Sequence, residues 1–483
     1  MRKFLVAALV FILSFSLFIY SRSNHQPITY SDYTHQNLKW QSCGGAFQCA
    51  TFQVPVNYNE PSGDRFTLQV LRHRATGKSQ GTLFVNPGGP GASAVDYASN
   101  AQSIVSPVIY KSFDILGVDP RGVGGSSAFR CLTDAQEDKY LANFGEVTSP
   151  QILKEMMKAS QDFVAACAKN AGNRIGHYST LESAKDMEVL RQILGLPKLN
   201  YLGKSYGTYL GALYGALFPD KVGRFVLDGA IDPGVPYDKQ MLAQAVGFDK
   251  ALQDFFTAKG GKFASHTKRL IADSYVQPLK NKSGRVLTNP LLITALAAGL
   301  YDDTNQWAPL SDAITSAAKD KNSDGLFALV DMYYDRNGQG HYVSNQNDIA
   351  EVITCNDWRD ARTLNQVAAD SGLFAQSAPI FGPTLNYSDL PCRYWPVTPL
   401  TFTNRYTLQT PVIVVGGVKD PATPYQWAVG LSKEIGSAVL LRFTGEGHTG
   451  YLRGDSCIDG AVNAYLVAGK VPSPSLSCVD GGH

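Results

Sequence analysis

Short runs of consecutive apolar residues recur along the chain, and longer stretches with helical character separate several of them. The clearest runs are 82–86, 113–119, 199–203, 224–228, 412–416 and 438–443, and the clearest helical stretches among them are 151–171 and 183–194. Continuous apolar runs of this length are typical of strands buried on both faces of a parallel sheet. The alternation of the two patterns predicts a doubly wound α/β sheet.

The alternation is interrupted between residues 233 and 405. This stretch reads as mostly helical, with 249–258, 291–301 and 310–320 as the clearest helices, and the strand pattern resumes at Thr410. An insertion between two strands, near their carboxyl ends, is expected to form a cap. We therefore predict a core of residues 23–232 and 406–483 that begins with a loop-rich lead-in, and a helical cap of residues 233–405.

The first residues follow a different pattern from the rest. Met1-Arg2-Lys3 precedes the apolar stretch FLVAALVFILSFSLFIY. A basic start followed by such a stretch is typical of a secretory signal. No clear A-x-A cleavage site follows, and a spanning helix needs about 17–25 apolar residues, so an uncleaved signal anchor is the alternative. Either reading places the body outside the cytoplasm, with membrane contact only through residues 1–22 if they are retained.

The eight cysteines agree with export. An even number in an exported chain predicts disulfides, and pairing of sequence neighbours is the simplest arrangement. The expected pairs are Cys43–Cys49, Cys131–Cys167, Cys355–Cys392 and Cys457–Cys478. A zinc site is disfavoured, because no pair is C-x-x-C and no histidine stands at ligand spacing.

Composition and charge add little to this picture. Of the 483 residues, 44% are hydrophobic and 17% charged, as in an ordinary globular protein. The formal net charge is only +2, and no long run of Lys and Arg is present. A nucleic-acid partner is therefore not expected.

The segment Gly203-Lys204-Ser205-Tyr206-Gly207 matches G-x-S-x-G. The bare pattern is weak, but here it follows a predicted strand and opens a helical stretch, as a nucleophile elbow requires. The flanking glycines have a physical reason, because a Cβ in so tight a turn would collide with the neighbouring helix and strand. Ser205 is therefore the candidate nucleophile.

A serine hydroxyl needs a base to take its proton, and with this elbow the partners follow in the order Ser, acid, His. His448 lies just after the predicted strand 438–443 and is the candidate base. Asp420 ends the segment PVIVVGGVKD and is the favoured acid, which would orient the imidazole and stabilise its charged form. Asp228, at the end of RFVLD, is the rival acid one strand earlier.

The loop Asn86-Pro87-Gly88-Gly89-Pro90-Gly91 follows the first predicted strand. Glycines there leave room for backbone N–H groups to point inward at a developing oxyanion. The expected donors are the amide of Gly89 and the amide of Tyr206, the residue after the nucleophile. A plain Gly/Pro turn is the alternative, but four elements in one consistent order favour catalysis.

Together these motifs resemble the tripeptidyl aminopeptidase branch of the prolyl-aminopeptidase-like serine peptidases. The resemblance rests on NPGGPG, DPRGVGGSS, GKSYGTYLGALYGALFPDKVGRFVLDGAIDP, GGVKDPATP and GEGH, and it runs from about Cys43 to Cys478. One position departs from the commonest prolyl aminopeptidase pattern, which has His where this chain has Pro87; the tripeptidyl branch fits better. The resemblance implies an α/β-hydrolase fold, with a mostly parallel sheet flanked by helices and a largely helical inserted cap.

The resemblance also implies hydrolysis of peptides from a free N-terminus, without cofactor or metal. A carboxylate in the cap should then pair with the α-amino group of the substrate. The sequence does not select it among Asp302, Asp303, Asp331, Asp335, Glu351 and Asp357. A carboxylesterase with the same Ser–His–Asp residues is the nearest alternative. A catalytically silent binding protein is a second, since fold alone does not imply function.

Overall fold

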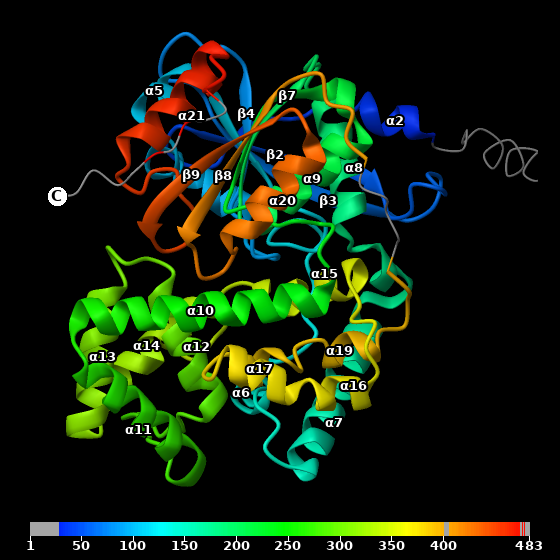
Figure 1. The fold of residues 1–483 in the computed structure, drawn as a ribbon. Coiled ribbons are helices and arrows are strands. Elements are labelled where there is room, and N and C mark those ends of the chain that lie inside the picture. Colours follow the sequence, from blue (N-terminus) through cyan, green and yellow to red (C-terminus); the bar gives the residue numbers. More distant parts are fainter. Residues whose placement is uncertain (1–28, 400–404, 474–475, 477, 479–483) are drawn as a thin grey trace, which may run out of the picture.

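The computed structural model describes residues 29–399, 405–473, 476 and 478. These residues form two layers, a sheet with its own covering helices and a helical layer on one side of it (Figure 1). The predicted signal segment, residues 1–22, lies outside the described residues. Within the described ranges, no helix is both long and apolar enough to span a membrane.

The described chain contains a nine-stranded sheet in the order β1-β2-β3-β5-β4-β6-β7-β8-β9. The last six strands in this order run parallel, whereas β1, β2 and β3 join them antiparallel at one edge. The strands are Gln41–Ser42, Phe47–Pro55, Arg65–His73, Thr82–Asn86, Asp114–Val118, Leu199–Lys204, Val222–Asp228, Val412–Lys419 and Ala438–Glu446 for β1 to β9. The six parallel strands are the six predicted apolar runs, so the predicted fold class is confirmed.

The prediction of a loop-rich lead-in is wrong, because β1, β2 and β3 form there. The second half of β2 alternates between buried and exposed residues. That alternation is typical of an antiparallel strand with one solvated face, and a search for continuous apolar runs does not detect it. Val54 of β2 and Phe66 of β3 are register partners and are both fully buried, so this hairpin belongs to the core.

Successive residues of the central strands face opposite sides of the sheet, and each side is covered by helices. In β4, Leu83 and Val85 pack on the side of α3, α5 and α21, while Phe84 packs on the side of α8, α9 and α20. The helices of the sheet layer are α2 (Tyr30–Thr34), α3 (Ala94–Ser99), α4 (Ala101–Ile104), α5 (Pro107–Ser112), α8 (Thr180–Ile193), α9 (Tyr206–Leu217), α20 (Tyr425–Ile435) and α21 (Ser456–Ala468). Burial on both faces explains why these strands read as continuous apolar runs.

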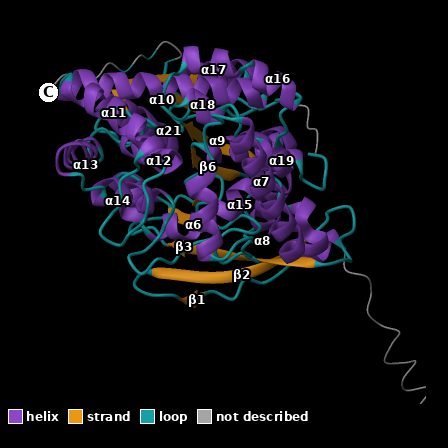
Figure 2. Ribbon diagram, turned by 90° about the horizontal axis from the view of Figure 1, so that it is seen from below, coloured by secondary structure: helices purple, strands orange, loops and turns teal. Residues whose placement is uncertain are grey.

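The helical layer lies at the carboxyl ends of the parallel strands and, seen from below, in front of the sheet (Figure 2). Its apolar core includes Phe255, Leu292 and Leu310, each with no exposed surface. The inserted helices are α10 (Tyr237–Lys259), α11 (Lys262–Val276), α12 (Asn289–Leu300), α13 (Trp307–Asp320), α14 (Asp324–Tyr333), α15 (Gln346–Asp357), α16 (Leu364–Ala369), α17 (Ser371–Ser377), α18 (Gly382–Leu385) and α19 (Leu390–Arg393). The three helices expected from the sequence correspond to α10, α12 and α13, and only the second, 291–301, extends one residue past the end of its helix.

Two more helices belong to this layer although they precede the insertion in the chain. They are α6 (Asp134–Asn143) and α7 (Pro150–Ala171), from the segment that the sequence assigned to the first part of the core (Figure 1). Met156 of α7 clusters with Val367 and Leu390 of the inserted segment, and Leu141 of α6 packs against the cap core. The cap is therefore built from two separate stretches of chain.

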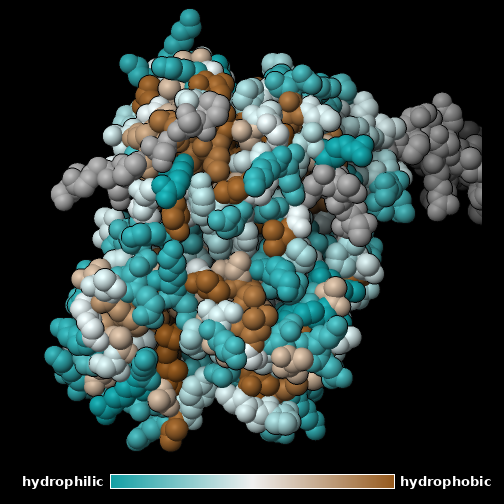
Figure 3. Space-filling view, in the orientation of Figure 1, coloured by the Kyte–Doolittle hydropathy of each residue, from teal (hydrophilic) through white to brown (hydrophobic). Residues whose placement is uncertain are grey.

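Four disulfides hold local segments together. The pairs are Cys43–Cys49, Cys131–Cys167, Cys355–Cys392 and Cys457–Cys478, as the sequence order suggested. Two of them lie in the cap region, where Cys131–Cys167 ties α7 to the segment before α6 and Cys355–Cys392 ties α15 to α19. On the face drawn in Figure 3, groups of hydrophobic residues reach the surface between hydrophilic ones, as is usual for folded proteins.

Candidate active site

Ser205 stands on the sharp turn between β6 and α9. Its backbone has φ 54° and ψ −127°, a conformation that is strained for a residue with a side chain. A Cβ on Gly203 would lie 2.5 Å from the carbonyl oxygen of Gly207, and a Cβ on Gly207 would lie 2.9 Å from the carbonyl oxygen of Asn86. Helix and strand thus leave no room for side chains at the flanking positions, which is the reason expected for both glycines.

His448 and Asp420 come from two loops that meet beside this turn. Nδ1 of His448 lies 2.9 Å from both carboxylate oxygens of Asp420. The carboxylate also accepts hydrogen bonds from the amides of Ala422 (2.9 Å), Thr423 (2.8 Å) and Thr449 (3.0 Å), and it is 4% exposed. These bonds fix the Asp420 carboxylate in place, so that it can orient the imidazole.

The rival acid, Asp228, has a different set of partners. Its carboxylate accepts hydrogen bonds from the amides of Gly450 (2.7 Å) and Tyr451 (3.0 Å), and Nζ of Lys204 lies 3.7 Å away. Asp228 therefore holds the backbone of the loop that follows His448, whereas Asp420 contacts the imidazole itself.

Ser205 and His448 line the same cavity, which has a volume of about 630 Å³. Nε2 of His448 is buried and has no hydrogen-bond partner among the described residues. With Nδ1 bound to Asp420, Nε2 is the ring nitrogen left to exchange a proton in the cavity. Nucleophile and base thus face one space that a substrate could enter.

The loop after β4 packs directly against the nucleophile. A Cβ on Gly88, whose φ is +101°, would lie 2.9 Å from Cβ of Ser205 and 3.0 Å from the amide nitrogen of Tyr206. Gly89 follows with φ +108° and lines the cavity. Tyr206 is the first residue of α9, where amides have no acceptor within the helix. The loop that carries Gly89 therefore packs against the same turn that carries Ser205 and the amide of Tyr206.

The end of α12 in the cap contacts the candidate base, His448, and sequence reasoning did not anticipate this contact. The carbonyl oxygen of Tyr301 accepts a hydrogen bond from the amide of His448 (2.8 Å), and the two rings meet edge to face at 5.3 Å. Arg453, in the loop after His448, pairs with Asp302 (2.8 Å) and with Asp303. No sequence signal joins residues so distant in the chain, because only the docking of the cap brings them together.

We expect Arg453→Met to lower kcat for ester and amide substrates about tenfold, which corresponds to about 1.4 kcal/mol of transition-state stabilisation. The reason is that Arg453 binds the cap to the loop of the catalytic base in a setting where its side chain is only 13% exposed. Steady-state kinetics on both substrate types measures the effect. The matched control is Arg285→Met, which removes the ion pair with Asp331 (2.7 Å) inside the cap. Equal effects of the two substitutions would contradict the assignment.

Five of the six cap carboxylates considered for the substrate amine do not line the cavity. They are Asp302, Asp303, Asp331, Asp335 and Asp357. Most of them have other partners, since the first two bind Arg453, Asp331 binds Arg285, and Asp357 accepts a hydrogen bond from the amide of Thr180 (2.8 Å).

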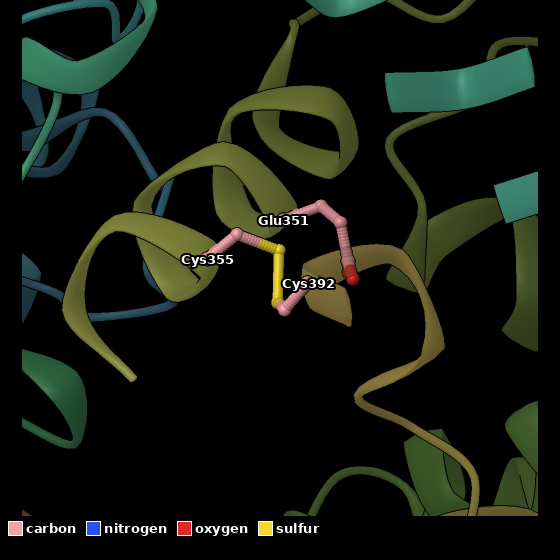
Figure 4. Close-up of side chains that lie close together, drawn as sticks. All are labelled: Glu351, Cys355 and Cys392. Carbon is pink, nitrogen blue, oxygen red and sulfur yellow. A yellow bond between two sulfur atoms is a disulfide. The ribbon is translucent and has the colours of Figure 1, made fainter. Parts of the chain in front are cut away.

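Glu351 of α15 does line the cavity, together with Glu137 and Asp348. Glu137 is bound by Arg130 and Asp348 by the amide of Cys131, whereas no hydrogen bond or ion pair to Glu351 is found among the described residues. Its carboxylate lies against the Cys355–Cys392 disulfide (Figure 4), within 4.8 Å of both sulfurs.

Burial, and secondarily the charge of Asp389, raise the pKa of Glu351 to about 7. An unpaired carboxylate in such a setting lacks a cation that would stabilise its charged form. Among the carboxylates that line the cavity, Glu351 is therefore the one left open to a ligand.

A mostly parallel sheet, a serine on a strained turn after β6, and a histidine bound to a carboxylate define a serine hydrolase of the α/β-hydrolase class. A family model described as TAP-like protein matches residues 378–478. The chain is 33% identical over 478 residues to serine protease Hip1 of Mycobacterium tuberculosis, covering 94% of this chain and 91% of that protein. It is 35% identical over 460 residues to carboxylesterase B of the same organism, covering 89% and 86%.

Tripeptidyl aminopeptidase of Streptomyces lividans is 30% identical over 469 residues, covering 91% of this chain and 86% of that protein. Among solved structures, proline iminopeptidase of Mycobacterium smegmatis is 15% identical, with a TM-score of 0.37 and coverage of 86% and 97%. From the sequence relatives, the chain belongs to the TAP-like family of α/β-hydrolases. The names of these relatives include both peptidases and an esterase, so the family alone does not fix the substrate.

Proposed function

We propose that the protein is an exported serine exopeptidase that releases short peptides from free N-termini. The observation that carries this proposal is Glu351, a carboxylate that has no hydrogen-bond or ion-pair partner among the residues the structure describes and that lines the same cavity as Ser205. The α-ammonium group of a peptide is the cation that would complete this site, because pairing stabilises the charged form of a half-buried carboxylate. A peptide whose amine is bound at Glu351 would present to Ser205 a carbonyl group that lies a short segment further along the peptide.

In the proposed mechanism, Ser205 Oγ attacks that carbonyl while His448 Nε2 takes its proton and passes it to the leaving amine. Asp420 holds Nδ1–H and stabilises the imidazolium. The amides of Gly89 and Tyr206 stabilise the tetrahedral oxyanion. Water, activated by His448, then hydrolyses the acyl-enzyme and frees the peptide. The scheme uses neither a cofactor nor a metal ion.

Two finer points belong to the proposal. Export is supported by four disulfides, which form and persist in oxidising compartments, and by the signal-like N-terminus. Release of tripeptides is supported by the name of the Streptomyces relatives, tripeptidyl aminopeptidase. Peptides with a free N-terminus are therefore the proposed partners.

We expect Glu351→Gln to lower kcat/KM for free-amine peptide amides by about 10–150-fold, since a bond to a charged group contributes about 1.5–3 kcal/mol. The loss should lie mainly in KM, and an ester without an amino group should be turned over as before. Steady-state kinetics on both substrates tests this, with Glu60→Gln on an exposed loop as the matched control. Parallel losses on amide and ester would argue against Glu351 as the amine ligand.

The pH dependence of 1/KM gives a second readout of the same variant. Below pH 7 Glu351 binds a proton and loses its charge, because its pKa is raised to about 7. Above about pH 8 a peptide α-amine loses its own charge. The affinity for free-amine substrates should therefore peak between these values in the wild type. Glu351→Gln should lack the acidic limb; its persistence would show that another group binds the amine.

The alternative of a carboxylesterase is favoured by the relative named carboxylesterase B. Both activities use the same Ser–His–Asp residues, so the leaving group decides between them. Turnover of short-chain esters with no cleavage of any free-amine amide would support the esterase. A silent binding protein would instead fail to react with a fluorophosphonate at Ser205.

A further inference from the structure

A second cavity, of about 620 Å³, lies along α6 and α7 beside the active-site cavity. The two cavities share three lining residues, Leu132, Tyr140 and Phe163. Much of the remaining lining consists of exposed side chains, such as those of Lys154 and Lys158, so this cavity is a groove at the surface. We name it the α6–α7 groove.

Aromatic rings separate the groove from the active-site cavity. The Tyr140 ring stacks on Phe163, with centroids 5.1 Å apart, and meets Phe144 at 5.3 Å. Phe163 is 2% exposed, and one turn further along α7 Cys167 forms the disulfide with Cys131. Packing and the disulfide thus hold these rings firmly. We call Tyr140, Phe144 and Phe163 the aromatic wall.

The aromatic wall stands on the Glu351 side of the cavity. All three rings line the active-site cavity together with Glu351. Tyr140 is half-buried, and the charge of Glu351 adds to the effect of burial in raising the pKa of its hydroxyl. Ser205 lies in the other layer, at the carboxyl end of β6. A peptide with its amine at Glu351 and its carbonyl at Ser205 would therefore have its first residue next to the aromatic wall.

We propose that the aromatic wall sets the length of the segment accepted on the acyl side of the scissile bond. The wall blocks the path by which a longer substrate peptide would continue past Glu351 into the α6–α7 groove. This inference rests on the proposed function, because the wall limits length only if the N-terminus is bound at Glu351. Removal of one ring would join the cavity to the groove and give an N-terminal extension a path to solvent.

The test compares the wild type with Phe163→Ala and Tyr140→Ala on three chromogenic amides. These are a free tripeptidyl amide, the same peptide extended by three residues at its N-terminus, and its N-acetyl form. For the extended and acetylated amides, kcat/KM should rise at least tenfold in the variants relative to the wild type. Mass spectrometry should show the extended acyl fragment released intact in one step. The matched control, Phe263→Ala, removes a buried ring of the cap that lines neither cavity.

If an alanine variant does not fold, Phe163→Leu or Tyr140→Leu replaces it, because leucine is smaller than the aromatic ring but still fills part of its space. For these variants we expect a smaller rise of kcat/KM for the extended and acetylated amides. Circular dichroism and a cooperative thermal unfolding transition report that each variant is folded. Folded variants that still reject extended and acetylated amides would overturn the inference and leave the proposed function intact. Failure of the wild type to cleave any free-amine amide would overturn the proposed function and the inference with it.

Discussion

Ser205→Ala is expected to abolish turnover of amides and esters alike, with kcat falling by at least about 10⁴-fold. Without the hydroxyl no acyl-enzyme can form, and the residual rate comes only from binding and from the oxyanion donors. The strained turn should persist, because it is held by the close packing of Gly203 and Gly207 and not by the serine side chain. Steady-state kinetics and intact-mass analysis after fluorophosphonate treatment measure the two consequences.

The control for Ser205→Ala is Ser265→Ala, which changes an exposed serine of α11 in the cap. It should keep full activity and take up one equivalent of the probe. Covalent labelling of Ser205→Ala at the wild-type rate would place the nucleophile elsewhere in the chain.

Asp420→Asn should lower kcat by about 10⁴-fold, because an amide at this position no longer enforces the productive tautomer of His448. The amide oxygen of Asn can still accept the bonds from Ala422 and Thr423, which both go to one carboxylate oxygen of Asp420, so the side chain stays in place and the loss reports on the imidazole. The measurement is kcat together with the free energy of unfolding, which should fall by about 1–3 kcal/mol, because a backbone amide that was bonded to the carboxylate then faces an NH2 group.

Asp228→Asn is the matched control, since Asp228 is a second buried carboxylate at the end of a neighbouring strand. It holds the amides of Gly450 and Tyr451, so an amide there should lower the free energy of unfolding by about 1–3 kcal/mol. Its effect on kcat should be far smaller than that of Asp420→Asn. The reverse order of the two kcat losses would make Asp228 the acid.

The parallel part of the sheet was predictable because its strands are buried on both sides and therefore read as continuous apolar runs. The strands β2 and β3 escaped the same search, since one face of each is solvated and the apolar signal alternates. The place of α6 and α7 in the cap was not predictable either. The sequence predicted the helix of α7, at residues 151–171, but not the layer against which it packs, and it did not predict α6.

The chain order of Ser205, Asp420 and His448 was readable because each follows a strand that ends at the same edge of the sheet. The sequence could not single out Glu351 among the six carboxylates, because that choice depends on which of these side chains already have partners in the protein. Arg453 illustrates the same limit, as its pairing with Asp302 joins two segments that only the fold brings into contact.

Because the cap is built from two separate chain segments, recombination between members of this family can exchange one segment without the other. An exchange of only the long insertion between two relatives would combine α6 and α7 of one parent with the inserted helices of the other. Met156 of α7 would then pack against side chains from a different protein. The aromatic wall would then come from one parent and Glu351 from the other. Both segments must therefore be exchanged together, and chimeric enzymes should be designed with α6–α7 and the long insertion taken from the same source.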